Sequence, residues 1–340
     1  MLPSLLDTIL DRSVVLGYTN LGYRIRSSRW GADPARMEGR VVLVTGATSG
    51  LGLASAEGFA RLGASVRLLV RSEDRGARAR AQIVERTGNE DVSVWLCDLS
   101  DLSSVREFAA GFIAEEPRLH VLVNNAGVLA EARTLSSEGV ELTFATNVLG
   151  PFLLTNLLSG LLEQSAPARI INVSSGGMYT QRIHVDDLQT ALGHYDGAVA
   201  YARSKRAQVI LTELWAQSLL GTGVAVHAMH PGWADTPGVE SSLPRFYTAT
   251  RPLLRTPQQG ADTILWLGAA PGPGLDTGGF WHDRRRRPTH LLPWTRETPE
   301  ERDRLWAECT RLTARELGAF DQQKAERLAA ALEPERIARA

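Results

Sequence analysis

The chain has 340 residues, 44% of them hydrophobic, so it is long enough to bury a large core in one or two domains. Its net charge of −1 argues against nucleic acid as a partner, and its two distant cysteines, Cys97 and Cys309, argue against a disulfide framework or a zinc site. We therefore expect a soluble protein of a reducing compartment, the cytoplasm.

Residues 1–36 form an N-terminal extension that charged side chains interrupt, so it is too broken to span a bilayer. The apolar side chains that fall roughly on one helical face are Leu2, Leu5, Leu6, Ile9 and Leu10. We expect this helix to pack on its own domain or on a second subunit. Contact of residues 1–16 with a membrane is the less favoured alternative, because the polar face is not basic.

From residue 39 onward, short apolar runs alternate with longer helical patterns. The runs that we predict to be strands are 40–46, 65–70, 92–97, 119–127, 168–175 and 223–232. The predicted helices are 51–63, 72–87, 101–115, 137–163 and 199–220. Strands that are apolar throughout and alternate with helices indicate an α/β fold with a mainly parallel sheet and helices on both faces. We expect this central domain to cover residues 37–292.

The chain ends in a predicted helical tail, residues 293–340. Residues 298–338 suggest two helices, and the first has a good start signal, with Thr298 as cap, Pro299 in the first turn and Glu301 behind it. Four consecutive arginines, Arg284–Arg287, precede the tail. We interpret them as a solvated loop balanced by the acidic residues that follow, because no aromatic or wider basic surface accompanies them.

A glycine-rich turn follows the first predicted strand and opens the next helix. It reads TGATSGLG over residues 45–52. Gly46 permits a tight turn, Gly50 lets the backbone approach a pyrophosphate, and Gly52 lets the helix pack closely on the strand. The helix N-terminus offers free N–H groups to the phosphates. A strand before and a helix after this turn are the context that a dinucleotide-binding loop requires.

The chain resembles the short-chain dehydrogenase/reductase family over roughly residues 39–285. The TGxxxGxG loop carries this resemblance together with Asp98-Leu99, NNAG at 124–127, Asn147, the serine pair 174–175, YxxxK at 201–205, and PG at 231–232 followed by Thr236. Several further stretches, such as VSSGGM at 173–178, resemble one particular branch of the family. The resemblance implies a Rossmann-type, doubly wound sheet and an oxidoreductase that uses a nicotinamide dinucleotide.

We expect the dinucleotide to be NADP(H) rather than NAD(H). The second predicted strand ends at Val70, where an acidic residue would contact the adenosine ribose of NAD, and Arg71 follows. A guanidinium there can pair with a ribose 2′-phosphate. The complete set of predicted cofactor-binding residues is Gly46, Thr48, Ser49, Gly50, Leu51, Gly52, Arg71, Asp98, Leu99, Asn125, Ala126, Gly127, Tyr201, Lys205, Pro231, Gly232 and Thr236.

Tyr201 and Lys205 form the predicted proton-transfer pair. Lys205 is one of only two lysines among 37 basic residues, and positions i and i+4 share a helix face. A phenol has an ordinary pKa of about 10, which a nearby ammonium lowers. Tyr201 could then exchange a proton with a carbonyl or alcohol oxygen. In the family, the lysine also binds the nicotinamide ribose.

Ser175 and Asn147 complete the predicted catalytic set. Ser175 ends the fifth strand and can orient the substrate oxygen beside Tyr201, with Ser174 as the competing candidate. By resemblance, Asn147 holds a water that links the lysine to solvent, and Thr236 anchors the nicotinamide carboxamide. We expect Asn124 to be structural. The pair Tyr247 and Arg251 repeats the spacing of Tyr201 and Lys205, but we place it in a loop without a catalytic role.

The sequence thus predicts a carbonyl reductase or alcohol dehydrogenase. An NADP-binding sensor on the same fold is the alternative, and an NAD-dependent alcohol oxidase would require Arg71 to be irrelevant. The residues that we expect to form the walls of a lipophilic substrate site are Met178, Tyr179, Trp233 and Phe246. The substrate and the oligomeric state are not readable, although the family commonly forms dimers or tetramers. No metal is expected.

Overall fold

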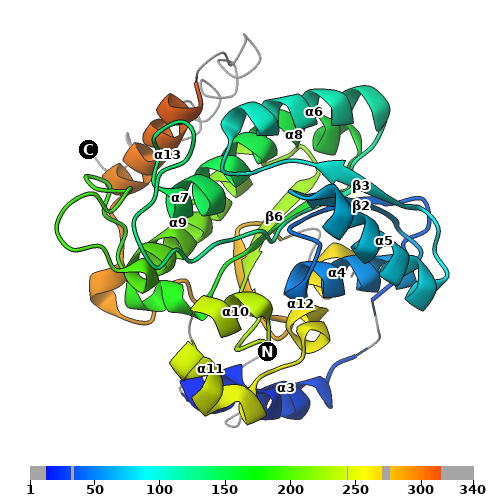
Figure 1. Cartoon of the computed structure of the whole chain (residues 1–340), viewed down its shortest axis with the longest axis horizontal. Helices are drawn as coiled ribbons and strands as arrows, with labels where there is room; N and C mark the ends of the chain where they lie inside the picture. The colour runs from blue at the N-terminus through cyan, green and yellow to red at the C-terminus, as the bar shows by residue number, and fades with distance from the viewer. Residues whose placement is uncertain (1–12, 32–33, 243, 270–275, 315–340) are drawn as a thin grey trace.

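The computed structural model describes residues 13–31, 34–242, 244–269 and 276–314 (Figure 1). One eight-stranded sheet with the order β3-β2-β1-β4-β5-β6-β7-β8 forms its centre. The strands are β1 (Val41–Thr45), β2 (Ser65–Val70), β3 (Val92–Leu96), β4 (Val121–Asn124), β5 (Ala168–Val173), β6 (Val224–Met229), β7 (Gly279–His282) and β8 (Arg285–Arg287). All neighbouring strands are parallel except β7 and β8. The predicted doubly wound, mainly parallel sheet is therefore confirmed.

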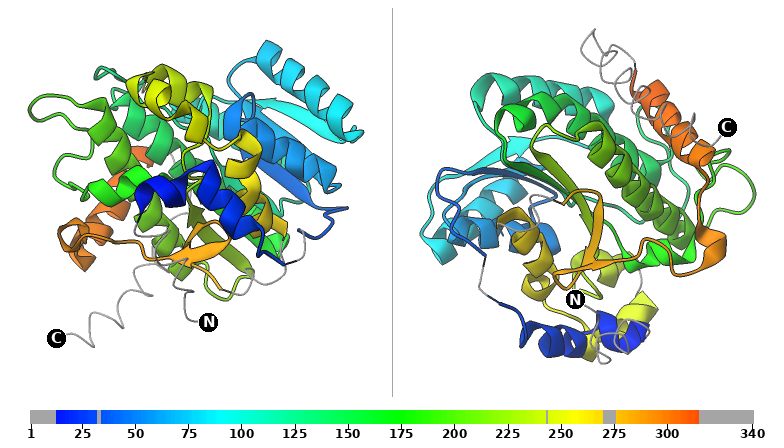
Figure 2. Two further views of the ribbon diagram at one scale, coloured as in Figure 1. Left: turned by 90° about the horizontal axis from the view of Figure 1, so that it is seen from below. Right: turned by 180° about the vertical axis from the view of Figure 1, so that it is seen from behind.

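Helices cover both faces of this sheet (Figures 1 and 2). On one face lie α4 (Gly50–Arg61), α5 (Glu73–Thr87) and α12 (Pro257–Ala269). On the other lie α6 (Leu102–Glu115), α8 (Gly150–Gln164) and α9 (Gly197–Ser218). The stretch Leu142–Gln164 is apolar and long enough to cross a membrane, but 83% of its apolar window is buried inside the protein. Its hydrophobicity is explained by its place in the core.

The sheet has its topological switch point between β1 and β4. Strands β2 and β3 lie on one side of β1, whereas β4, β5 and β6 extend the sheet on the other side. Because the connections on the two sides run over opposite faces, the carboxyl ends of β1 and β4 border a crevice. The loops that carry the predicted site follow these carboxyl ends.

Two helical segments differ from the sequence prediction. The single helix expected over 137–163 is divided into α7 (Leu142–Phe144), a π-helical turn η1 (Ala145–Leu149) and α8. Short helices α10 (Pro237–Ser242), α11 (Pro244–Thr250) and η3 (Arg251–Leu253) follow β6. The prediction of a loop around Tyr247 was therefore wrong, because Tyr247 lies in α11. Its phenol donates to Asp235 at 3.1 Å.

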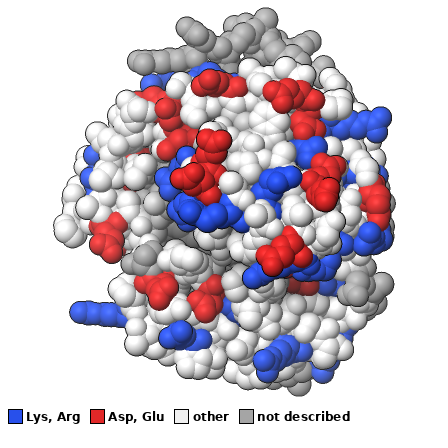
Figure 3. All heavy atoms as spheres, turned by 45° about the vertical axis from the view of Figure 1, so that its right-hand side comes forward, with Lys and Arg blue, Asp and Glu red and all other residues white. Residues whose placement is uncertain are grey.

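The arginine run 284–287 is not a solvated loop, and this prediction was wrong. Arg285–Arg287 form the antiparallel edge strand β8, and Arg287 is buried. Its balancing carboxylates precede it in the chain: Arg284 pairs with Asp262 and Arg286 with Asp276. Arginines and carboxylates intermingle over the face seen in Figure 3, in keeping with the near-zero net charge.

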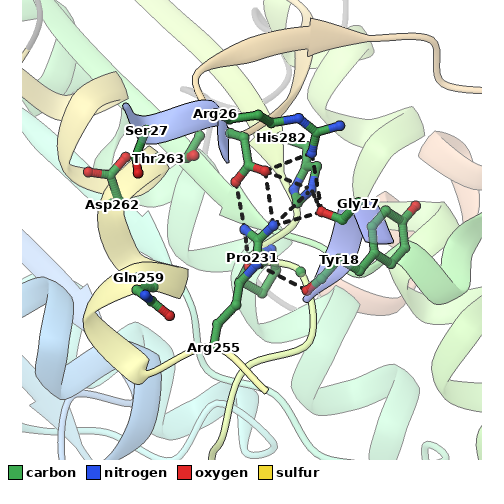
Figure 4. Close-up of polar contacts among 12 residues, drawn as sticks. Gly17, Tyr18, Arg26, Ser27, Pro231, Arg255, Gln259, Asp262, Thr263 and His282 are labelled. Atoms are coloured by element: carbon green, nitrogen blue, oxygen red, sulfur yellow. Dashed lines mark hydrogen bonds and ion pairs between the residues drawn. The ribbon is translucent and has the colours of Figure 1, made fainter. Parts of the chain in front are cut away.

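The described part of the N-terminal extension packs on the sheet domain. Its two short helices, α2 (Val14–Tyr18) and α3 (Asn20–Ser27), lie at the lower edge of the molecule in Figure 1, and Asn20 donates to the carbonyl of Pro252 in η3 at 3.4 Å. Arg26 donates to Asp283 in the β7–β8 turn at 2.8 Å, and Arg255 pairs with the same carboxylate (Figure 4). The leucines and isoleucine predicted to form a helix face before residue 11 lie outside the described residues.

The first predicted tail helix is confirmed as α13 (Pro299–Thr313). It begins with the predicted capping box, in which Thr298 and Glu301 bond each other's backbone N–H groups. Leu305 and Cys309 of this helix are buried in the core cluster of α6, α8 and α9. The second predicted helix lies outside the described residues. A 3-10 turn η5 (Pro293–Thr295) leads into the tail, and another, η2 (Gly176–Thr180), follows β5.

Candidate active site

A cavity of about 730 Å³ lies along the carboxyl ends of the central strands. Its volume is in the range of small-molecule sites in proteins. The predicted site residues that line it are Gly46, Thr48, Ser49, Gly50, Leu51, Arg71, Leu99, Asn125, Ala126, Gly127, Ser174, Ser175, Tyr201, Lys205, Pro231, Gly232 and Thr236. The structure therefore brings together residues that are up to 190 positions apart, from Gly46 to Thr236.

The glycine loop adopts the geometry that a phosphate-binding turn needs. Gly46 has φ +65°, in the left-handed region that favours glycine. A Cβ on Gly52 would lie 2.3 Å from the carbonyl oxygen of Gly46, so the helix could not pack this closely with any other residue there. The side chain of Ser49, the cap residue of α4, makes no capping hydrogen bond. The first N–H groups of α4 thus remain available to an anion.

Thr45 ties the loop after β4 to the glycine loop. Its hydroxyl accepts the N–H groups of Asn125 and Ala126 at 2.9 Å, and its carbonyl accepts the side-chain amide of Asn125 at 2.9 Å. Asn124 is structural, as predicted, because its side chain donates to Asn172 of β5 and to Thr155 of α8. These bonds fix the cofactor-side wall of the cavity.

Two arginines stand at the far end of the cavity. Val70 ends β2 and lines the cavity, with exposed Arg71 directly after it. Ser72 caps α5, and Arg75 in the first turn of that helix lines the cavity as well. Arg75 was not predicted from the sequence. It follows Arg71 by four residues, across the start of a predicted helix, and this spacing was a usable signal.

Asp98 is placed differently from its neighbours. Cys97 and Leu99 line the cavity, whereas the carboxylate of Asp98 accepts hydrogen bonds from the N–H and hydroxyl of Ser100. Its predicted contact with the cofactor stays a prediction.

Tyr201 and Lys205 share one face of α9, as predicted. The Nζ atom of Lys205 lies 5.5 Å from the centroid of the Tyr201 ring. Lys205 is buried, and its ammonium donates to the carbonyl oxygen of Val173 at 2.9 Å and to Oε1 of Gln208 at 3.1 Å. An ammonium has three donors, so one remains for a ligand in the cavity.

Burial dominates the protonation of this pair. It raises the pKa of Tyr201 to about 12, while a hydrogen bond with the Ser175 side chain acts in the opposite direction. Burial also lowers the pKa of Lys205 to about 7. The lowering of the Tyr201 pKa that we expected from Lys205 is outweighed in this state. Tyr201 is therefore a protonated phenol at neutral pH, the form that donates a proton.

The two serines after β5 have distinct roles. The hydroxyl of Ser174 is buried and donates to the carbonyl oxygen of Lys205 at 2.9 Å, which anchors α9 to the end of β5. The Ser175 hydroxyl accepts the N–H of Gly177 and bonds Tyr201. Ser175 is thus the serine that is free to meet a ligand beside Tyr201.

Asn147 lies in the π-helical turn η1 and is fully buried. Its side chain accepts the N–H of Val128 at 2.8 Å and donates to Ser204 of α9 at 3.0 Å. Its main-chain carbonyl accepts the amide of Gln208 at 2.7 Å. Asn147 therefore joins three elements around Lys205. Gln208 was missed by the sequence analysis.

The opposite wall comes from the loop after β6. Trp233 and Phe246 line the cavity, as expected for a lipophilic site, and their rings meet edge to face at 5.0 Å. Met178 and Tyr179 instead belong to a small core cluster with Phe280, so their predicted place in the substrate wall was wrong. The carbonyl of Tyr18 in the extension accepts the N–H of Trp233 at 2.8 Å.

A doubly wound fold with this cavity defines a dinucleotide-binding oxidoreductase, and comparison with known proteins agrees. The family described as short chain dehydrogenase matches residues 40–245. The bovine dehydrogenase/reductase SDR family member 12, from Bos taurus, is 42% identical over 294 residues, which cover 85% of this chain and 91% of that protein. Human retinol dehydrogenase 11, from Homo sapiens, is 40% identical over 255 residues, 73% of this chain and 78% of that protein.

Solved structures extend the comparison. A protein from Beutenbergia cavernae that is described as an NAD(P)-dependent gluconate 5-dehydrogenase, with NADP bound at low occupancy, matches 74% of this chain and 97% of that chain, with 27% identity and a TM-score of 0.61. The chain belongs to the short-chain dehydrogenase/reductase family, and its similarity to member 12 confirms the branch that the sequence stretches indicated. It is an oxidoreductase of the class that acts on CH–OH and C=O groups.

Proposed function

We propose that the protein is an NADP(H)-dependent enzyme that interconverts a lipophilic carbonyl compound and its alcohol. The observation that carries this proposal is the convergence of Tyr201, Lys205 and Ser175 on one cavity that begins at the glycine loop. A cofactor-binding sensor would not need a phenol and a buried ammonium at this spacing, because burial of an ammonium without a carboxylate partner is costly.

The chain's own groups divide the work of carbonyl reduction. When bound, the reduced nicotinamide supplies the hydride that goes to the carbonyl carbon. The Ser175 hydroxyl orients the carbonyl oxygen, and the Tyr201 phenol gives its proton to that oxygen to complete the alcohol. The ammonium of Lys205 holds the nicotinamide ribose with its remaining donor and stabilises the phenolate that is left.

The donor set fits a dinucleotide phosphorylated on its adenosine ribose. The free N–H groups of α4 suit the pyrophosphate. Arg71 and Arg75 line the adenosine end, where no carboxylate lines the cavity among the described residues. NADP-bound relatives of similar fold support the same preference.

The substrate end favours a lipophilic molecule. Trp233, Phe246, Val128 and Leu129 supply apolar surface beyond Ser175 and Tyr201. Retinol dehydrogenases are among the relatives, so all-trans-retinal and all-trans-retinol are suitable first probes beside simple ketones and aldehydes.

The proposal is tested by a screen of the purified protein with NADPH against these carbonyl compounds, followed by nicotinamide absorbance. Tyr201→Phe should abolish the turnover that the screen finds. The matched control is Tyr247→Phe, because Tyr247 precedes an arginine at the same spacing but bonds Asp235, and it should keep that turnover. Tight NADPH binding without turnover of any probe would favour the sensor.

A further inference from the structure

Gln208 forms a buried bridge between Lys205 and Asn147. It lies one helical turn after Lys205 on α9, and 3% of its surface is exposed. Its Oε1 accepts the ammonium of Lys205 at 3.1 Å, and its Nε2 donates to the main-chain carbonyl of Asn147 at 2.7 Å. The bridge therefore joins α9 to the π-helical turn η1 next to Lys205, the partner of the proposed proton donor Tyr201.

The orientation of this amide is set by its partners. The carbonyl oxygen of Asn147 only accepts hydrogen bonds, so the NH2 group of Gln208 must face it. The amide oxygen must then face Lys205. An amide oxygen stabilises the charged ammonium more than the neutral amine, because the hydrogen bond to a charged donor is stronger.

The other contacts of Lys205 give the bridge its importance. Among the described residues, the ammonium contacts the Val173 carbonyl, the Gln208 amide and the face of the Tyr201 ring, and no carboxylate is among these contacts. Tyr201, on the same helix, is the titratable group that faces Lys205. From β5 the uncharged carbonyl of Val173 faces it, and the side chain of Asn147 in η1, which is also uncharged, lies near Gly127 as the ammonium does. The charge of Lys205 in its buried position thus depends on two neutral oxygens.

We infer that Gln208 is a positioning residue that keeps Lys205 charged and aimed into the cavity. Its side chain connects Lys205 with Asn147, the residue that the sequence predicted to hold a relay water. This inference rests on the proposed function. An amide donates and accepts hydrogen bonds without passing a proton onward, so a Gln208 bridge fixes the charge beside Tyr201 and does not deliver protons. Its chemical role is to stabilise the Tyr201 phenolate through Lys205.

The two lysines of the chain allow a direct test without substrate. In a Lys324→Arg background, Lys205 is the one remaining lysine, so protein labelled with 15N-lysine gives a single Nζ signal whose pH titration reports its pKa. Gln208→Met fills the same space without polar atoms and should lower the pKa of Lys205 by about one unit or more. Gln208→Glu places a carboxylate there and should raise it by about one unit or more.

The two Gln208 variants are similar in size but should shift the pKa of Lys205 in opposite directions. A general disruption of the structure would shift this pKa in the same direction in both variants, so opposite shifts identify an electrostatic role. The matched control is Thr212→Val, which removes a buried hydroxyl of α9 that accepts from Asn172 and donates to the main-chain carbonyl of Gln208, but leaves the side chain of Gln208 and its contact with Lys205 in place. It should leave the pKa of Lys205 unchanged. If Gln208→Met fails to fold, Gln208→Glu alone tests the inference, because it should raise the pKa of Lys205. An unchanged pKa in the folded Gln208 variants would overturn the inference.

A second readout connects the bridge to catalysis. With NADP+ and all-trans-retinol as probe, the pH profile of oxidation by Gln208→Met should move to higher pH. Turnover at neutral pH should then fall roughly tenfold for each pH unit by which the profile moves. A profile that coincides with that of the parent enzyme would contradict this role. Failure of the proposed function gives a different result, namely turnover that survives Tyr201→Phe, or no turnover while the Lys205 titration still responds to Gln208.

Discussion

At the scale of single residues, burial sets the protonation state of Tyr201 in the free enzyme. The phenol of Tyr201 stays protonated far above neutral pH, because its environment disfavours the phenolate. A protonated phenol is the donor for carbonyl reduction, whereas alcohol oxidation requires the phenolate as base. The free enzyme at neutral pH therefore holds Tyr201 in the form that carbonyl reduction uses.

This protonation state predicts different pH profiles for the two directions. Since the pKa of Tyr201 is raised to about 12, reduction should not decline through loss of the phenolic proton at neutral pH. Oxidation of the alcohol should instead rise with pH, by about tenfold per pH unit while the phenolate is the scarce form. Initial rates in both directions measure this. A reduction rate that falls tenfold per pH unit above about pH 8, with oxidation flat, would contradict the assignment of Tyr201.

The two arginines after β2 predict the cofactor preference. Arg71→Asp removes a charge-assisted hydrogen bond worth about 1.5–3 kcal/mol and adds a repulsive charge, so NADPH binding should weaken roughly 10- to 100-fold or more. NADH binding should change little. Fluorescence titration measures both. Arg78→Asp is the control, because Arg78 is an exposed arginine of α5 outside the cavity lining. Equal losses for both cofactors would show that Arg71 does not read the 2′-phosphate.

Several site residues follow directly from the sequence, and others do not. Tyr201, Lys205 and the glycine loop stand out because their spacing is local and their chemistry is specific. Gln208 became visible only in the fold, since a single glutamine on a helix gives no signal until its partner is known, whereas the spacing of Arg75 from Arg71 was a signal in the sequence. Met178 was misplaced because an apolar residue near a site has the same pattern whether it faces the cavity or the core.

At the scale of elements, a buried ion cluster joins the extension, the loop after β6 and the β7–β8 turn (Figure 4). The carboxylate of Asp283 accepts Arg26 at 2.8 Å and both Nη atoms of Arg255 at 2.6 and 2.9 Å. Arg255 also donates to the carbonyls of Gly17, Tyr18 and Pro231. Arg255 therefore connects the extension to the loop that carries Gly232 and Thr236.

Removal of Asp283 should destabilise the whole domain. Asp283→Ala leaves two buried guanidinium groups without their carboxylate, which costs about 3–5 kcal/mol in the free energy of unfolding. Asp276→Ala removes the exposed partner of Arg286 and should cost under about 1 kcal/mol. Urea unfolding measures both. Similar small losses in the two variants would show that the buried cluster is not a structural requirement.

The same cluster predicts a loss of stability in acid. Burial disfavours the charged carboxylate of Asp283, but the ring of His282 and the guanidinium groups of Arg255 and Arg26 together hold its pKa well below the ordinary value. The stabilising contribution is therefore complete above the unfolded pKa of about 4 and is lost as the pH falls below it. Relative to the parent, Asp283→Ala should show a weaker dependence of stability on pH in this acidic range.

The turn that holds Asp283 explains why the arginine run was misread. Asp283 and Arg284 have φ +51° and +55°, the conformation of a two-residue hairpin turn, so the chain reverses and Arg285–Arg287 pair with β7. Four like charges in sequence suggest a loop when their partners are unknown. The partners Asp262 and Asp276 come from other segments, and such distant pairing is not visible in local sequence.

At the scale of the whole molecule, the parallel sheet brings the predicted groups together. The sequence predicts the order of strands and helices well, because apolar runs of this length between helical patterns have few other solutions. The order β3-β2-β1-β4-β5-β6 then places the ends of β1, β4 and β5 side by side, with α9 crossing behind them. One cavity thus receives the glycine loop, the two arginines, Ser175 and the Tyr201–Lys205 pair.

The most direct measurement is a single-turnover reaction of the enzyme with NADPH that carries deuterium at the transferable position of its nicotinamide. With a carbonyl probe that turns over, the parent protein should place deuterium on the carbonyl carbon. Tyr201→Phe should still bind NADPH while the rate of transfer falls by about 100-fold or more. Deuterium transfer at an undiminished rate in Tyr201→Phe would contradict the role of Tyr201 as proton donor.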